Sequence, residues 1–476
     1  MLRSLRTYAF KARKYCLGLC CPSRILYVPN EIIINNIKDN EELTYSTFLL
    51  KGTITHNNCD LINNKFMVVL NGNNIKNVIN TDKQFKVLLE LKQGLNLIIM
   101  NFCCLLKELK VFFNPKTSLQ KLVPLYIIIK NYNGLFQAPK HVKNDAKSAC
   151  KRIETVTKLL QCFIAEKLNE EFFERKTFQI EPCKTFYSNL NLDEAIKMSQ
   201  KDLWESLGRE IMVSKLGDTN NKYLGVLSCT KYLGNKELIK YDEMINKTEG
   251  FVAMGGGGFA LLGSACLYTW PEEISEVFEK FADESLVDCD NFLNDSCYRN
   301  TLGACFSTTL GSVLHELCHT FDLGHTQGGV MGRGFDDIHE FFLDLSSKNN
   351  LNHLINKNGF IREKSIPKNS EKVYKSNKSY FTQSCLAIIF YHKFFNDHRV
   401  LNQAKPSFNI ENKVVHSTNG IRVIEIREKD SELVLNSWVF LGRVLKFSFQ
   451  IHDNIGNTII VAVDNLGNIL KQYNES

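Results

Sequence analysis

The sequence has no apolar run long enough to cross a membrane. Its best candidate, Leu95–Leu106, contains Asn96 and Asn101, whereas a transmembrane helix needs about 20 apolar residues. We therefore expect no transmembrane segment and interpret this run as a pair of buried strands. A strong basic patch is also missing, because the 476 residues carry a net charge of only +7 and the Lys residues are scattered. This composition indicates no nucleic-acid partner.

The sixteen cysteines contain no CxxC pair. Apart from two adjacent pairs they are dispersed along the chain. A large protein does not need disulfides, and dispersed thiols are typical of a reducing compartment. We expect a cytoplasmic protein with free cysteines. Secretion, with bridges among Cys289, Cys297 and Cys305, remains an alternative.

Residues 1–43 form a basic N-terminal segment that lacks a continuous apolar stretch. A secretory signal requires such a stretch after its basic start. Here it is interrupted by three basic residues, Arg6, Lys11 and Lys14. Three interpretations stay open: a mitochondrial transit peptide, a weak membrane association through palmitoylated cysteines, or a poorly ordered basic end. The cysteines concerned are Cys16, Cys20 and Cys21.

A run of four glycines lacks the Lys-Ser/Thr that a phosphate-binding loop requires. The run comprises Gly255, Gly256, Gly257 and Gly258. Two interpretations have equal weight. The glycines let an extended substrate pair with an edge strand through main-chain hydrogen bonds, or they form a flexible loop between two strands. No cofactor-binding loop is predicted here.

The most informative stretch is His315-Glu316-Leu317-Cys318-His319. Side chains four residues apart lie on one face of a helix, so His315 and His319 can bind one zinc ion. A catalytic zinc takes three protein ligands and keeps one open position. His325, six residues further on, is the candidate for the third ligand. We predict one zinc ion, with Glu316 placed to reach a water bound to the metal.

With Met331 following six residues after His325, this pattern resembles the metzincins, zinc peptidases with HExxHxxGxxH and a Met-turn. The resemblance implies that the three histidines are the ligands, Glu316 the general base and Met331 the Met-turn. Asp322 occupies the position of the family's glycine. The glycine supports a left-handed bend, a conformation that Asp tolerates better than most residues.

The wider stretches HTQGGVMGRGFDDIHEFF and GGGGFALLGSACLYTWPEE resemble one group in particular, the eukaryotic "putative zinc metallopeptidase" family. The likeness runs over most of residues 45–400. The expected activity is that of a zinc-dependent endopeptidase acting on a peptide or protein substrate. A zinc-bound water would attack the peptide carbonyl, and Glu316 would act as general base.

Several roles around the metal are open at this stage. Three aspartates are candidates to orient the histidine rings: Asp322, Asp336 and Asp337. The Tyr that some metzincins carry just after the Met-turn is absent, which leaves water, Arg333 or His339 as candidates to stabilise the oxyanion.

Two alternatives to the predicted site and activity also remain. One is a gluzincin-type site in which Glu340, followed by Asp344, supplies the third ligand. The other is a non-catalytic scaffold stabilised by zinc, whose β domains bind a protein or glycan partner. A fourth protein ligand that closes the site would favour the scaffold.

Short apolar runs of strand length, separated by turn signals, fill residues 44–118 and return in residues 401–476. They predict two β-rich units, the first a β-sandwich with an accessory role. Between them, a continuous apolar strand, Leu122–Lys130, is followed by a long amphipathic helix. We predict an α+β fold in which a metzincin-like catalytic domain over residues 119–400 is flanked by β-sandwich-like domains.

Overall fold

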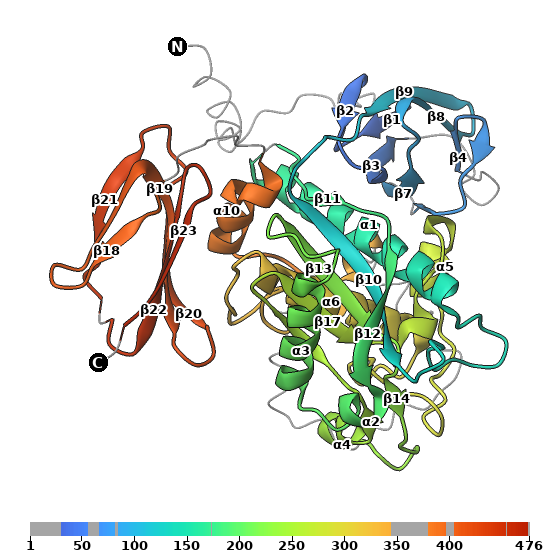
Figure 1. Ribbon diagram of the computed structural model, residues 1–476. Helices are drawn as coiled ribbons and strands as arrows, with labels where there is room; N and C mark the ends of the chain where they lie inside the picture. The colour runs from blue at the N-terminus through green and yellow to red at the C-terminus, as the bar shows by residue number, and fades with distance from the viewer. Residues whose placement is uncertain are drawn as a thin grey trace, which may run out of the picture.

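The computed structural model describes residues 30–55, 66–80, 84–172, 174–343, 379–396, 404–453 and 455–474. Helices and sheets are both present, in agreement with the predicted α+β class. Figure 1 shows a central unit of helices around a sheet, a first β unit above it and a second β unit beside it. None of the described helices is long and apolar enough to cross a membrane.

The first β unit consists of two sheets that share a buried apolar core. One sheet contains β1 (Glu31–Ile34), β3 (Thr47–Thr55), β7 (Gln84–Glu90) and β6 (Val78–Asn80), in that order. The other contains β2 (Glu41–Leu43), β9 (Leu105–Phe113), β8 (Gly94–Phe102), β4 (Met67–Leu70) and β5 (Asn73–Asn74).

The first β unit begins earlier in the chain than the sequence indicated. β1 pairs with β3, and β2 pairs with β9, so both strands lie inside the segment that we assigned to a basic terminus ending at residue 43. They are only four and three residues long, too short for a period-two pattern to be recognised. Arg6, Lys11, Lys14 and the cysteines of that segment lie outside the described residues.

The central sheet is mostly parallel. β10 (Lys121–Lys130), β13 (Asn221–Leu227) and β17 (Phe259–Gly263) run parallel, and β16 (Ala253–Gly256) closes the sheet antiparallel to β17. β11 (Gln179–Ile180) and β12 (Lys184–Asn191) pair with β10. Alternate β10 side chains face two separate apolar cores. Burial on both faces explains why its sequence is apolar throughout.

Helices cover both faces of this sheet. α3 (Gln200–Val213) packs in one core, whereas α1 (Ala146–Phe172) and α6 (Leu302–Thr320) pack in the other. Short elements connect them: α2 (Leu192–Ala195), β14 (Lys231–Tyr232), α4 (Tyr241–Asn246), β15 (Thr248–Glu249), η1 (Leu267–Thr269), η2 (Ile274–Glu276) and α5 (Val277–Phe281). After α6 come η3 (Gly334–Asp337), α7 (His339–Phe342), α10 (Gln383–Tyr391) and η4 (Lys393–Phe395).

The second β unit is built around one long strand, β19 (Val414–Glu428). The other strands of its sheet are β18 (Ser407–Asn409), β20 (Val434–Val439), β21 (Lys446–Gln450), β22 (Thr458–Asp464) and β23 (Ile469–Tyr473). β18 and β21 pair with the first half of β19, and β20 and β22 pair with its second half. The hairpin that joins β19 to β20 reaches the central unit, as described below.

The described cysteines are mostly reduced. Eleven are not in a disulfide bond, and Cys289, Cys297 and Cys305 are among them. The alternative of bridges within that cluster is therefore wrong. Cys103 is disulfide-bonded, which dispersed spacing did not predict.

A buried ion pair joins the first β unit to α1. The Arg175 guanidinium donates to the Glu166 carboxylate at 2.6 Å and also pairs with Glu41. Glu166 is only 1% exposed and accepts further hydrogen bonds from Asn36 and Tyr45. A buried carboxylate needs such compensation, because leaving it without a cation is costly.

We expect Arg175→Met to destabilise the protein by about 3–5 kcal/mol, because Glu166 stays buried and loses its cation. Arg209→Met is the matched control: Arg209 pairs with Glu205 at 2.6 Å but is 77% exposed, and such pairs contribute about 0–1 kcal/mol. Thermal melting of both variants tests this. Equal melting temperatures for the two variants would contradict it.

Candidate metal centre

The candidate site lies on one face of α6. Thr301 caps its first turn by accepting a hydrogen bond from the Ala304 N–H. In the second half of the helix the only residues that are not fully buried are Thr309, Ser312, Glu316 and His319. Their spacing of three, four and three residues places them along one stripe. The helix therefore presents a single face to a cleft, and the rest of its surface is packed.

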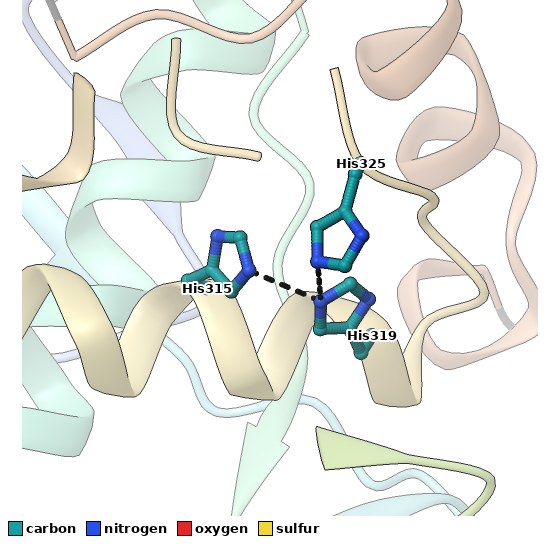
Figure 2. A group of neighbouring side chains, drawn as sticks. All are labelled: His315, His319 and His325. Carbon is teal, nitrogen blue, oxygen red and sulfur yellow. Dashed lines mark hydrogen bonds between the residues drawn. The ribbon is translucent and has the colours of Figure 1, made fainter. Parts of the chain in front are cut away.

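Three imidazole rings converge beside this stripe. Figure 2 shows His315 and His319 on α6 and His325 reaching down from the loop that follows. The Nε2 atom of His319 lies 3.1 Å from the Nε2 atoms of both His315 and His325. In the described part of the chain, these three residues form the one group of His, Cys, Asp and Glu donors compact enough to hold a metal ion.

Each ring is oriented by a backbone carbonyl. The Nδ1 atoms of His315 and His319 lie 2.9 Å from the carbonyl oxygens of Val330 and Leu323, respectively. The Nδ1 atom of His325 lies 2.5 Å from the Ser431 carbonyl oxygen. A carbonyl only accepts, so each Nδ1 carries the hydrogen and each Nε2 keeps its lone pair.

The three predicted aspartate partners of the rings are therefore wrong. The Asp322 carboxylate pairs with His392 at 3.5 Å, and Asp337 pairs with Arg299 at 3.2 Å. Asp336 is buried, and its carbonyl accepts from Arg299 and Ser307. A carbonyl orients an imidazole as well as a carboxylate does, but its position is invisible in the sequence.

The donor set fits zinc. Imidazole nitrogens bind zinc at about 2.0–2.1 Å, and tetrahedral geometry then places them roughly 3.3 Å apart. The observed separations of 3.1 Å are close to that value. Without a cation, three lone pairs would face one another at this distance. The residues present thus suit a single ion of this size and ligand preference.

Burial favours the neutral form of the two rings on α6, the form that a metal ligand needs. It lowers the pKa of His315 to about 4 and, together with the neighbouring rings, the pKa of His319 to about 3. Burial also raises the pKa of Glu316 to about 7, against a backbone hydrogen bond from Gly255 that lowers it. Glu316, next to His315 on α6, thus lies in a poorly hydrated place against β16.

The predicted left-handed bend after α6 is confirmed. Asp322 has a φ of +64°, and its N–H donates to the His319 carbonyl at 3.1 Å. The bend returns the chain so that His325 faces the helix. Arg427 holds it from outside, donating from its guanidinium to the Asp322 carbonyl at 2.7 Å.

The second β unit supplies part of the site. The main chain of His325 forms a parallel bridge with Leu433, accepting from the Val434 N–H at 2.8 Å and donating to the Glu432 carbonyl at 3.1 Å. Gly324 permits this contact, because a Cβ there would lie 2.6 Å from the Glu432 oxygen. The third ring is thus held by the β19–β20 hairpin, a contact that sequence reasoning missed.

The turn that contains Met331 lies against the first ligand. Met331 is 1% exposed, and its carbonyl accepts from the Thr326 N–H at 3.0 Å. Gly329 has a φ of +76°, which a turn of this shape requires. The preceding carbonyl, that of Val330, is the partner of the His315 ring. The turn therefore both supports and orients the site.

The glycine run is half strand and half turn, so it is not a loop throughout. Gly255 and Gly256 belong to β16, and Gly257 and Gly258 form the turn into β17. Gly255 packs on the helix, since a Cβ would lie 1.9 Å from the Glu316 carbonyl oxygen. At Gly258 the nearest atom would be 4.0 Å away. Only Gly255 is thus required by a close approach.

Two further polar contacts fix this strand. Lys222, buried on β13, donates to the Gly257 carbonyl at 3.0 Å and to the Thr320 carbonyl at the end of α6. Lys222 thereby joins the β16–β17 hairpin to α6.

Glu340, the gluzincin candidate, is exposed on α7 and does not belong to the histidine group. Its companion Asp344 lies outside the described residues.

The two side-chain candidates for the oxyanion role differ in position. His339 is turned away from the metal ligands, with its Nδ1 atom 2.8 Å from the Ser307 hydroxyl. Arg333 is exposed beside Phe335, and the Phe335 ring lies 5.3 Å from the His315 ring. The Arg333 charge also acts on His315, so Arg333 stays a candidate for this role, whereas the His339 ring is engaged by Ser307.

Comparison with known proteins agrees with this geometry. A family model described as "Putative peptidase family" matches residues 31–420. The chain belongs to this peptidase family. The sequence resemblance to eukaryotic zinc metallopeptidases is confirmed at the level of the family.

Two yeast relatives carry the description "Putative zinc metalloproteinase". The one from Schizosaccharomyces pombe is 25% identical over 279 residues, or 55% of this chain and 45% of the relative. The one from Saccharomyces cerevisiae is 24% identical over 262 residues, or 49% of this chain and 38% of the relative. The chain thus spans less than half the length of these curated relatives of the peptidase family.

A solved structure titled "Tandem Ig repeats of Dlar" covers 21% of this chain and 59% of its own, at 6% identity and a TM-score of 0.14. A likeness that weak carries no argument about this member of the peptidase family.

We expect Gly255→Ala to destabilise the protein by about 1–3 kcal/mol, because the added methyl overlaps the Glu316 carbonyl and the strand must move off α6. Gly258→Ala, in the same run, meets open space and serves as the control. Thermal melting of the two variants is the measurement. A Gly255→Ala variant as stable as Gly258→Ala would show that β16 does not pack this closely on the helix.

Proposed function

We propose that the protein is a zinc-dependent endopeptidase. The observation that carries the proposal is the convergence of three Nε2 lone pairs at the part of α6 that also carries Glu316, whose carboxylate is not itself a member of the metal-binding group. Family membership and the relatives' descriptions support a zinc peptidase. The ligands would be His315, His319 and His325.

The bound metal would supply Lewis acidity, which makes a water more acidic and polarises a carbonyl. Glu316 would do the proton chemistry. Its carboxylate accepts a proton from the attacking water and then delivers it to the leaving nitrogen. A pKa raised toward neutrality by burial suits a group that must both accept and release a proton.

β16 is the candidate for substrate binding. It is the last strand of its sheet among the described residues. The outward N–H groups of Ala253 and Gly255 are used by Gln200 and Glu316, respectively, so a substrate strand would pair through the outward carbonyls or displace these side chains. Gly255 lies directly on the turn of α6 that carries Glu316. An extended peptide added to this edge would run past the metal. This arrangement, with Met331 in a turn below the rings, supports the metzincin interpretation.

The scaffold alternative requires a closed site. In the part of the chain that the structure describes, the group of possible ligands has three members and no fourth protein donor. Three protein ligands with one open position are the arrangement of a catalytic zinc. The geometry therefore favours catalysis over a purely structural metal.

We expect the wild-type protein to retain one zinc per chain after dialysis and His325→Ala to lose most of it, because two histidines alone bind zinc weakly. His416→Ala, an exposed histidine on β19, is the control and should keep its metal. Atomic absorption gives the zinc content. Undiminished zinc in His325→Ala would remove this residue from the ligand set.

Glu316→Gln should lower the rate of peptide cleavage by about 10²- to 10⁴-fold, because the amide keeps the size of the side chain but cannot take up the proton. Zinc content and melting temperature should change little. Digestion of a diverse peptide library, read by mass spectrometry, compares the two proteins. Equal cleavage by wild type and Glu316→Gln would refute the assigned role, and no cleavage by zinc-loaded wild type would favour the scaffold.

A cytoplasmic location and the absence of a nucleic-acid partner stay predictions from composition. The same holds for weak membrane association of the N-terminal segment and for a role of the β domains in binding a partner.

A further inference from the structure

A cavity of about 350 Å³ opens beside the histidine group. Ser312, on the cleft-facing stripe of α6, and Phe335, whose ring packs on His315, form its wall on the metal side. Leu238, Tyr241 and Met244 form an apolar wall opposite. The volume is within the range of ligand pockets. A side chain carried on a substrate next to the scissile bond would enter it.

The inner part of this cavity is acidic. Asp295 and Asp336 both line it, and Asp336 is 7% exposed. Asp295 accepts a hydrogen bond from the Tyr241 hydroxyl, and burial raises the pKa of Asp295 to about 6. No ion pair of the described residues includes either carboxylate: Arg299, a partly buried cation nearby, pairs with Asp337, donates to backbone carbonyls, and acts on Asp295 and Asp336 only from beyond ion-pair distance.

The cations of the cavity stand at its rim. Lys236 is 74% exposed and pairs with Asp290 at 3.7 Å, outside the cavity. Arg333 is exposed and lies over the Phe335 ring. An entering group therefore passes positive charge at the mouth and meets negative charge inside.

We propose that this cavity binds a long cationic side chain, Arg or Lys, of the substrate residue adjacent to the scissile bond, with Asp295 and Asp336 as its charge partners. The proposal rests on the proposed peptidase function. The aliphatic stem lies along Leu238, Tyr241 and Met244, and the charged head reaches the carboxylates. A guanidinium or ammonium group matches a buried carboxylate better than any neutral group, because charged hydrogen bonds are the strongest available.

An acidic side chain is the competing occupant, with Arg333 as its partner. The distribution of charge disfavours it. Arg333 and Arg299 already act on Asp295 and Asp336, whose pKa values they lower, so an incoming carboxylate would compete with two carboxylates for cations that these already engage. Repulsion between like charges in a poorly hydrated cavity is costly.

The test compares arginine with citrulline, which has nearly the same shape and no charge. The probes are fluorescent eight-residue peptides with one fixed position, occupied by Arg, citrulline, norleucine or Glu, and mixed residues elsewhere. Binding to the zinc-loaded Glu316→Gln chain is measured by fluorescence anisotropy, so that no cleavage is needed. We expect Arg peptides to bind about tenfold more tightly than citrulline peptides, since a hydrogen bond to a charged group contributes about that factor.

Asp295→Asn in the same background should reduce the Arg/citrulline ratio to about twofold or less. Asp290→Asn, which removes a carboxylate from the same loop outside the cavity, should leave the ratio unchanged. The Arg/citrulline comparison in the unmodified cavity needs no folding of a cavity variant. Equal binding of Arg and citrulline peptides overturns the proposal, as does tighter binding of Glu peptides. Discrimination without any cleavage by the wild type would uphold the cavity and reject the peptidase function.

Discussion

The arrangement of this molecule depends on three hydrogen bonds, each from an imidazole N–H to a backbone carbonyl. They fix the tautomer of His315, His319 and His325 and aim three lone pairs at one point. Lone pairs 3.1 Å apart repel unless a cation lies between them. A bound cation would complete this arrangement of donors, so metal affinity and stability should be coupled.

The three carbonyls come from three different parts of the chain. Leu323 follows α6 directly, Val330 belongs to the turn of Met331, and Ser431 lies in the β19–β20 hairpin. The family match ends at residue 420, so the partner of the third ring lies beyond it. The second β unit is consequently part of the site's construction, where the sequence had indicated only a flanking module.

The sequence predicted those features that periodicity or motif spacing encodes. The buried strand β10, the long helix α1 and the residues that converge as a histidine group were all visible, because each repeats at a period or spacing dictated by its own geometry. Short strands such as β1 and β2 were missed, because a few residues cannot show a period. The orienting groups were assigned to aspartates, since side chains are visible in a sequence and carbonyl positions are not.

A backbone carbonyl is offered by every residue, so the side chain at position 431 can change without altering the hydrogen bond to His325. A sequence can, however, show where a backbone carbonyl approaches closely, because only glycine fits at such a position. Gly324 and Gly255 stand where a Cβ would overlap the Glu432 and Glu316 carbonyls, respectively. Arg427 is a second indication of main-chain support near His325. Its guanidinium is 1% exposed and therefore needs partners, one of which is the Asp322 carbonyl. Main-chain support of a metal site can therefore be recognised in a sequence only indirectly. The indications are glycines close to the metal-binding motif and an arginine, distant in the chain, that is buried.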